Sequence, residues 1–199
     1  DFCRHDEPVM QGESYYFTAL ARNKKSLSVN LKSREGKEIF HKLAAKSDII
    51  LESFRPGVTT RLGIDYEQIK AVKPDIIYCS LSGYGQSNPN SLKALHDINM
   101  QAQSGYLSLN GGKTSPLHLC DLASGMVAAQ AMLAALYQRS VSGKGNYIDI
   151  SMFDSFVWWN SMLDSRYYFY GGSLEAKDLE YPAVCYNIYD TKDGGKIAV

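Results

Sequence analysis

The sequence predicts an α/β fold in which a parallel, Rossmann-like sheet is flanked by helices. Two helix–strand units follow each other directly: residues 33–46 and 59–73 have apolar residues at helical spacing, and the β-type runs 48–52 and 75–80 come after them. Right-handed crossovers should make these two strands parallel. The loops after Leu51 and Ser80 should then meet at the carboxyl edge of the sheet, where open α/β sheets bind ligands.

Each element has its own signals in the sequence. Ser33 can begin the first helix, and the second is predicted as a single helix that ends ahead of Pro74. A third helix is expected over 122–139, and a glycine-rich turn at 142–145 should lead into an alternating strand over 146–150.

The last part of the chain is predicted to form one aromatic-rich helix and a hairpin. Aromatic residues such as Phe156, Trp158 and Trp159 wrap much of the helix expected over 152–168, a pattern typical of a subunit interface. Residues 186–199 indicate a β-hairpin around Asp193-Gly194. The sequence stops in the second strand and has no initiator Met, so we expect a piece of a longer chain.

Composition excludes several classes of function. The 199 residues are 45% hydrophobic, which suits one large or two small globular domains. Equal numbers of basic and acidic residues give no broad attraction to nucleic acid or to an anionic membrane surface. Widely spaced cysteines argue against a zinc site and favour a reducing cytoplasm, and we expect no signal peptide and no membrane span.

Candidate chemistry gathers at the predicted loops and at one carboxylate. Asp121 lies where the chain turns into a helix, so the helix N-terminus favours its anion while burial opposes it; the alternative is a simple N-cap. In the loops, Phe54 and Tyr84 can cover a base while Arg55 and Arg61 meet phosphates. The alternative is that these residues belong to ordinary solvent-exposed turns and bind no ligand.

The order and spacing of these motifs resemble the class III CoA-transferases, the CaiB/BaiF type that includes formyl-CoA transferases. That family also contains alpha-methylacyl-CoA racemase. Residues 23–32 resemble its first basic segment, 52–57 its Glu-Asn-Phe-Arg-Pro-Gly loop and 78–86 its Ser-Gly-Tyr-Gly-Gln loop, while 142–154 and 189–194 resemble later motifs. The chain departs from the family at Ser53, where Asn is usual, and at Leu95, where Gly is common.

The resemblance implies an interlocked homodimer that uses coenzyme A or acyl-CoA and a carboxylic acid, with no prosthetic group and no metal. It implies a CoA-binding large domain over 1–140 that lacks its first strand and helix, a strand, helix and linker over 141–180, and the start of a small domain over 181–199. The thioester would reach Asp121. The residues implied for CoA binding are Val29, Asn30, Leu31, Lys32, Ser53, Phe54, Arg55, Arg61, Lys93, Ala94, Leu95 and His96.

Three functions remain open from the resemblance. In a transferase, Asp121 forms a mixed anhydride and then an aspartyl thioester with CoA. In a racemase, His96 and Asp121 flank the α-carbon as an acid/base pair. The third is a CoA-binding paralogue without turnover. We expect Asp149 and Asp154 to be caps, and we expect no metal site at His118.

Overall fold

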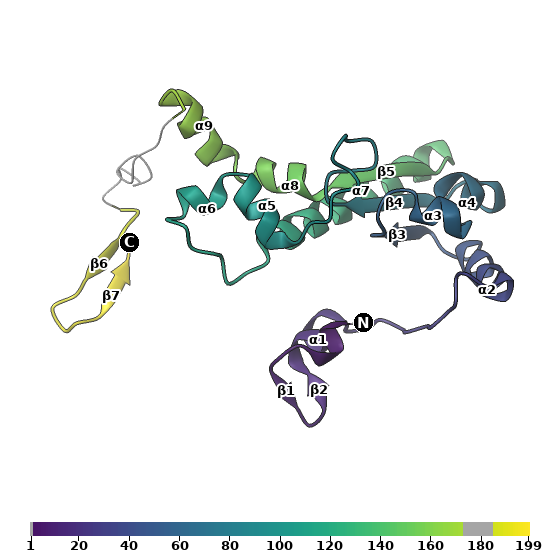
Figure 1. Cartoon of the computed structure of the whole chain (residues 1–199), viewed down its shortest axis with the longest axis horizontal. Coiled ribbons are helices and arrows are strands. Elements are labelled where there is room, and N and C mark those ends of the chain that lie inside the picture. The colour runs from purple at the N-terminus through teal and green to yellow at the C-terminus, as the bar shows by residue number, and fades with distance from the viewer. Residues whose placement is uncertain (1, 173–184) are drawn as a thin grey trace.

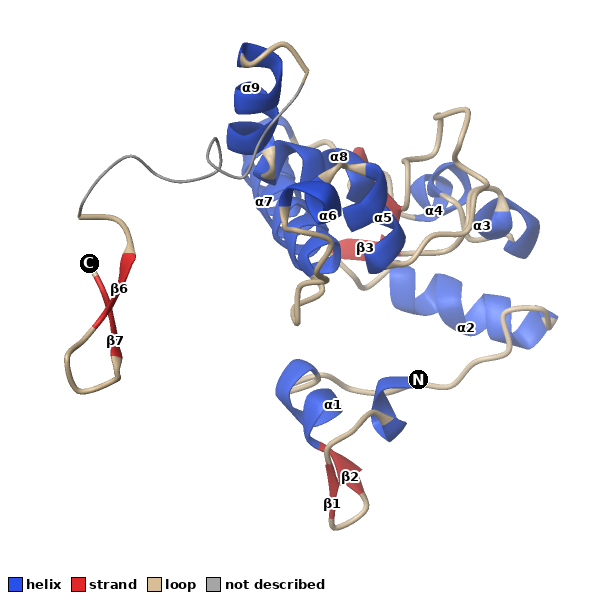
Figure 2. Ribbon diagram, turned by 60° about the vertical axis from the view of Figure 1, so that its left-hand side comes forward, coloured by secondary structure: helices blue, strands red, loops and turns tan. Residues whose placement is uncertain are grey.

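A computed structural model of the chain describes residues 2–172 and 185–199 (Figures 1 and 2). Its centre is a parallel sheet of β3 (Ile49–Glu52), β4 (Ile77–Ser82) and β5 (Asn146–Ser151), in the order β3-β4-β5. The α/β architecture with flanking helices is therefore confirmed. The domain boundary expected at 180/181 lies outside the described residues.

Helices pack against both faces of this sheet. On one face, Tyr78 and Ile76 form a buried cluster with Ala44 of α2 (Arg34–Ala44) and Ile69 of α4 (Tyr66–Val72). On the other face, Cys79 and Ile150 pack against α7 (Leu119–Ser142), which runs beside the strands in Figure 1. Alternating β4 side chains therefore serve two separate cores.

The helix predicted over 59–73 is two helices, α3 (Val58–Leu62) and α4. Gly63 has a φ of +77°, the left-handed conformation that ends α3, and Asp65 caps α4 by accepting the Gln68 N–H at 3.1 Å. The sequence predicted one helix because buried Ile64 continues the helical spacing of apolar residues across the break between α3 and α4.

The helix predicted over 152–168 is also divided, into α8 (Met152–Trp159) and α9 (Ser161–Phe169). Asn160 is buried between them and takes part in both junctions. Of the aromatic residues on α8, Phe156 is in the core, whereas Trp158 is 69% exposed. The aromatic side chains are distributed around α8 because one face of the helix is buried in the core and the opposite face is exposed.

Shorter elements precede, follow and connect the elements of the sheet along the chain. The N-terminal part contains a 3-10 turn (Phe2–His5), an antiparallel pair β1 (Val9–Met10) and β2 (Glu13–Ser14), and α1 (Tyr15–Leu20). Helices α5 (Asp97–Gln103) and α6 (Tyr106–Leu109) precede α7. The predicted C-terminal hairpin is confirmed as antiparallel β6 (Ile188–Asp190) and β7 (Lys196–Ala198), with Gly194 at a φ of +82°.

Among the described residues, α7 alone is long and apolar enough to cross a membrane by length and composition. An 18-residue window has a mean hydropathy of 1.6, and 28% of that window is buried. The sequence shows no uninterrupted apolar run there because Gln130 falls inside the window. Ala123 and Ala128 of α7 lie in two core clusters.

Candidate active site

A cavity of about 410 Å³ lies at the carboxyl edge of β3 and β4. The loop after β3, the end of β4, the segment before α5, and Asp121 of α7 all contribute to its wall. It brings together eight of the residues singled out in the sequence: Ser53, Phe54, Arg55, Lys93, Ala94, Leu95, His96 and Asp121. These eight residues come from three separate stretches of chain, so only the fold makes them neighbours.

The remaining predicted CoA-binding residues lie elsewhere. Val29, Asn30, Leu31 and Arg61 do not line this cavity. Lys32 lines a separate hollow of about 750 Å³ with cationic side chains of α2. The turn that holds Lys32 is fixed by Asn30, whose side chain accepts the Lys32 N–H at 3.0 Å.

The loop after β3 is shaped by Glu52. This side chain is buried, and its carboxylate accepts the N–H of Phe54 at 2.8 Å. The bond holds the backbone in a tight turn, and Phe54 remains partly exposed beside Arg55 on the cavity wall. The motif thus supplies an apolar ring and a guanidinium group on a fixed backbone.

The loop after β4 is held by side chains from two other elements. Tyr84 is buried and donates a hydrogen bond to the side chain of Gln103, and the Gln86 N–H lies 2.9 and 3.1 Å from the two carboxylate oxygens of Asp149. Burial of Tyr84 removes it from the wall on which a base was expected to stack. Asp149 is a loop clamp rather than the expected cap.

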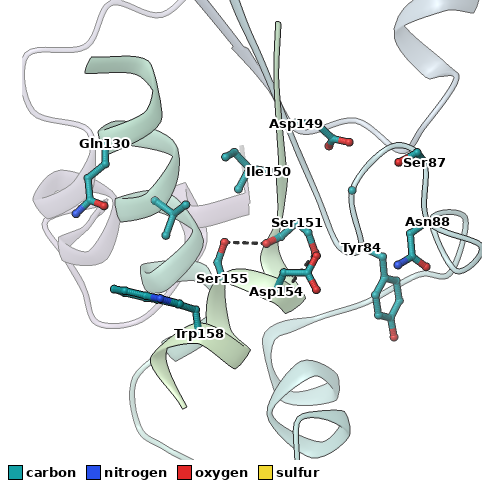
Figure 3. A pocket seen from close by; sticks show the side chains of 12 residues that line it. Tyr84, Ser87, Asn88, Gln130, Asp149, Ile150, Ser151, Asp154, Ser155 and Trp158 are labelled. Atoms are coloured by element: carbon teal, nitrogen blue, oxygen red, sulfur yellow. Dashed lines mark hydrogen bonds between the residues drawn. The ribbon is translucent and has the colours of Figure 1, made fainter. Parts of the chain in front are cut away.

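The junction of β5 and α8 corrects a second expectation. Ser151 caps α8 by accepting the N–H of Asp154 at 3.1 Å, so Asp154 occupies the first turn and is not the cap. Asp154 and Asp149 line a second cavity, of about 600 Å³, that also includes Trp158 (Figure 3). None of the predicted CoA-binding residues lines this second cavity.

Asp121 is the third residue of α7, not its N-cap. The helix begins at Leu119 with His118 as the capping residue, three residues earlier than the hydrophobic periodicity indicates. One oxygen of Asp97 accepts the N–H groups of Cys120 at 2.7 Å and Asp121 at 3.3 Å. Asp97 therefore performs the capping role from α5, 24 residues away in the sequence.

The other oxygen of Asp97 accepts a hydrogen bond from the side-chain amide of Gln101. Gln101 is buried, with 1% of its surface exposed. Asp97 thus joins α5 to the first turn of α7 and fixes the direction in which Asp121 leaves the helix. Sequence analysis missed this residue, because its contacts are made with a distant part of the chain.

The charge of Asp121 is set by opposing neighbours. Desolvation by burial, and then the negative charge of Asp97, raise the pKa of Asp121 above its ordinary value, while His118 and His96 act in the opposite direction. The side chain is 49% exposed, and His118 Nδ1 lies 3.7 Å from its Oδ2. From the sequence, His118 was considered only as a metal ligand; its spacing of three residues from Asp121 at the start of a helix is the signal that was overlooked.

Cys120 is not available as a nucleophile. The thiol is fully buried, and burial together with Asp97 raises its pKa far above neutrality, so it stays protonated. No group of three or more His, Cys, Asp or Glu side chains suited to a metal occurs among residues 2–172 and 185–199. Asp121 and His96, the two predicted catalytic residues, both line this cavity.

The whole chain is similar to known proteins. The family described as CoA-transferase family III matches residues 1–199. Human succinyl-CoA:glutarate CoA-transferase is 37% identical over 195 residues, covering 94% of this chain and 44% of that protein. Human alpha-methylacyl-CoA racemase is 35% identical over 204 residues, covering 98% of this chain and 53% of that protein. The chain spans about half the length of these curated relatives.

A solved structure of the same kind extends the match to three dimensions. A CAIB/BAIF family protein from Brucella suis superimposes with a TM-score of 0.86 at 28% sequence identity. The match covers 98% of this chain and 54% of that one. The parallel sheet and its helices are thus those of this group of proteins.

Proposed function

This chain belongs to CoA-transferase family III, and from that premise we propose that it transfers coenzyme A from an acyl-CoA thioester to a carboxylic acid, with Asp121 as the covalent nucleophile. The observation that carries the proposal is the position of the Asp121 carboxylate in one cavity with Arg55 and Lys93. Two cations suit the phosphates of CoA, and a carboxylate is the nucleophile that this transfer needs.

The proposed reaction proceeds through two kinds of intermediate. The Asp121 carboxylate attacks the thioester carbonyl, which gives a mixed anhydride and releases CoA thiolate. The thiolate then attacks the aspartyl carbonyl, so the first carboxylic acid leaves as its anion and an aspartyl thioester remains. The acceptor carboxylate attacks the carbonyl of this thioester, which releases CoA thiolate and gives a second mixed anhydride. The thiolate then attacks the acceptor's acyl carbonyl, so the new acyl-CoA forms and the Asp121 carboxylate leaves. Each step exchanges one acyl–oxygen or acyl–sulfur bond for another.

Several features support CoA as the ligand. The ring of Phe54 presents an apolar face beside the Arg55 guanidinium, which matches an adenine linked to phosphates. Outside the cavity, Lys32 gathers with Lys37 and Lys42 around the hollow beside α2. We propose that this hollow receives an outer phosphate of the same ligand, and that Val29, Asn30, Leu31 and Arg61 guide the chain between the two places.

A racemase is the second candidate, because His96 and Asp121 line the same cavity and a racemase is among the relatives. Proton removal on one face and delivery on the other require two groups of this kind. In a racemase, His96→Ala should abolish exchange of the substrate α-proton with deuterated water. In a transferase the same change should slow the transfer far less, since one carboxylate suffices.

We also propose that the protein works as a homodimer in the cytoplasm, with residues 1–140 as the CoA-binding domain. Trp158 and Trp159 of α8 are exposed, and large aromatic side chains of this exposure are typical of interfaces. They therefore support the proposal of a surface that contacts the partner subunit.

The test is an assay of the full-length protein with succinyl-CoA and a panel of dicarboxylic acceptors, chosen from the name of a relative. Formation of a new acyl-CoA is followed by liquid chromatography and mass spectrometry. We expect transfer by the native protein and none by Asp121→Asn. Asp154→Asn, which changes another carboxylate in the first turn of a helix, should remain active. CoA binding without transfer or α-proton exchange would favour the non-catalytic paralogue.

A further inference from the structure

The hydroxyl group of Ser82 is buried without a hydrogen-bond partner. Ser82 is the last residue of β4, is paired in register with Ser151, and has 7% of its surface exposed. Within the described residues, its Oγ has neither a donor nor an acceptor in reach. Ser82 nevertheless forms part of the cavity wall that contains Asp121.

Two other buried serines, Ser155 and Ser124, have hydrogen-bond partners. Ser155 is buried to the same extent, 7%, and its Oγ donates to the Ser151 carbonyl at 2.7 Å (Figure 3). The Oγ of Ser124 donates to the Asp121 carbonyl at 3.0 Å. Since a buried hydroxyl without a partner opposes folding, its presence at a cavity wall points to a partner that the protein chain does not supply.

Neighbouring contacts hold Ser82 in place. The carbonyl of Gly83 accepts the N–H of Phe153 at 3.0 Å, which extends the β4–β5 pairing by one step. The side chain of Leu95 lies on Gly83 so closely that a Cβ there would be 2.9 Å from Leu95 Cδ1. The backbone at Ser82 and Gly83 is thus held by the pairing with β5 and by Leu95, the neighbour of His96 in the sequence. A binding group that is already held in place loses less conformational entropy when the ligand binds.

Resting on the proposed function, we propose that the Ser82 hydroxyl binds the substrate by donating a hydrogen bond to a carbonyl oxygen of the acyl-CoA. Acyl-CoA offers two sources of that oxygen, the thioester carbonyl and the amides of the pantetheine arm. A hydroxyl suits either oxygen, because it rotates to donate and carries no charge. Ser82 would then set the depth at which the thioester stops beside Asp121.

Removal of the hydroxyl should have opposite effects on stability and binding. Ser82→Ala deletes an unsatisfied polar group, so the midpoint of thermal unfolding without ligand should stay the same or rise. The same change should weaken ligand binding by about two- to tenfold, the range of one neutral hydrogen bond. A purely structural serine would show the reverse pattern: lower stability and unchanged affinity.

The test is calorimetric titration of the full-length protein with free CoA and with succinyl-CoA. An Asp121→Asn background prevents turnover. Ser82→Ala, Ser82→Thr and Ser155→Ala are compared in that background. We expect weaker binding only for Ser82→Ala, with Ser82→Thr retaining the affinity because it keeps the hydroxyl. Ser155→Ala should unfold at a lower temperature and bind normally.

The two ligands separate the two carbonyl sources. A loss for both ligands assigns the bond to a pantetheine amide, and a loss for succinyl-CoA alone assigns it to the thioester. Equal affinities for the Ser82→Ala and parent proteins, or a lower unfolding temperature of Ser82→Ala without ligand, would overturn the role of Ser82 while leaving CoA transfer intact. Failure of the parent protein to bind either ligand would overturn both proposals.

Discussion

Replacement of Asp97 by Ala should loosen the helix start that presents Asp121. Three donors would lose their acceptor: the N–H groups of Cys120 and Asp121, and the buried side-chain amide of Gln101. Hydrogen bonds to a charged group contribute about 1.5–3 kcal/mol each, and their losses are not additive when they share one carboxylate. We therefore expect the free energy of unfolding to fall by about 3–5 kcal/mol.

Asp97→Asn refines this expectation. Its amide oxygen still accepts from the α7 backbone, but its NH₂ group opposes the Gln101 amide and the negative charge is gone, so the loss should be about 1–2 kcal/mol. Removal of that charge should also lower the pKa of Asp121, because Asp97 is one of the causes that raise it. The acidic limb of the transfer rate should then move to lower pH, since the carboxylate is the nucleophile.

Urea denaturation of the full-length protein, followed by tryptophan fluorescence, measures these changes. Asp154→Ala is the matched control, because it removes an exposed acid from the first turn of α8 and should change the free energy of unfolding by at most about 1 kcal/mol. If Asp97→Ala were no more destabilising than Asp154→Ala, Asp97 would not hold the two helices together, and our reasoning about the site would be wrong.

Three further changes test other parts of the account. His118→Gln removes one of the side chains that lower the pKa of Asp121, so this pKa should rise and the acidic limb of the rate profile should move to higher pH; an unchanged profile would exclude this coupling. Gly145→Ala would place a Cβ 2.1 Å from a backbone carbonyl before β4 and should lower the free energy of unfolding by about 1–3 kcal/mol, whereas Gly125→Ala, with open space around it, should not destabilise the protein. Arg55→Ala should weaken CoA binding by about tenfold in low salt and less in high salt, and equal losses at both salt concentrations would argue against a phosphate contact.

Local patterns predicted the sheet because each strand directly follows a helix of matching apolar period. The parallel direction of the strands then follows from the crossover rule, and the structure has it. The same local patterns failed where one residue interrupts a continuous apolar face. The conformation of Gly63 and the buried position of Asn160 divide two predicted helices, and neither changes the hydrophobic period.

The residues that line the candidate site were predictable from the sequence, but the hydrogen bonds that hold them in place were not. The loop at Phe54 and Arg55, the segment at His96, and Asp121 were all visible as motifs, and the fold places them around one cavity. The clamp from Asp97 was not visible, because a carboxylate at a helix start has its ordinary partners within the same turn. Here its partners belong to a helix that begins 22 residues later, a relation that a single sequence does not contain.

The most direct test of the central claim is peptide mass spectrometry of the full-length protein after brief incubation with succinyl-CoA. The account predicts CoA attached through a thioester to the peptide that contains Asp121, and its absence from Asp121→Asn. The adduct should disappear when an acceptor acid is added. Turnover by a protein whose Asp121 peptide stays unmodified under trapping conditions, or an adduct on another carboxylate, would contradict the account.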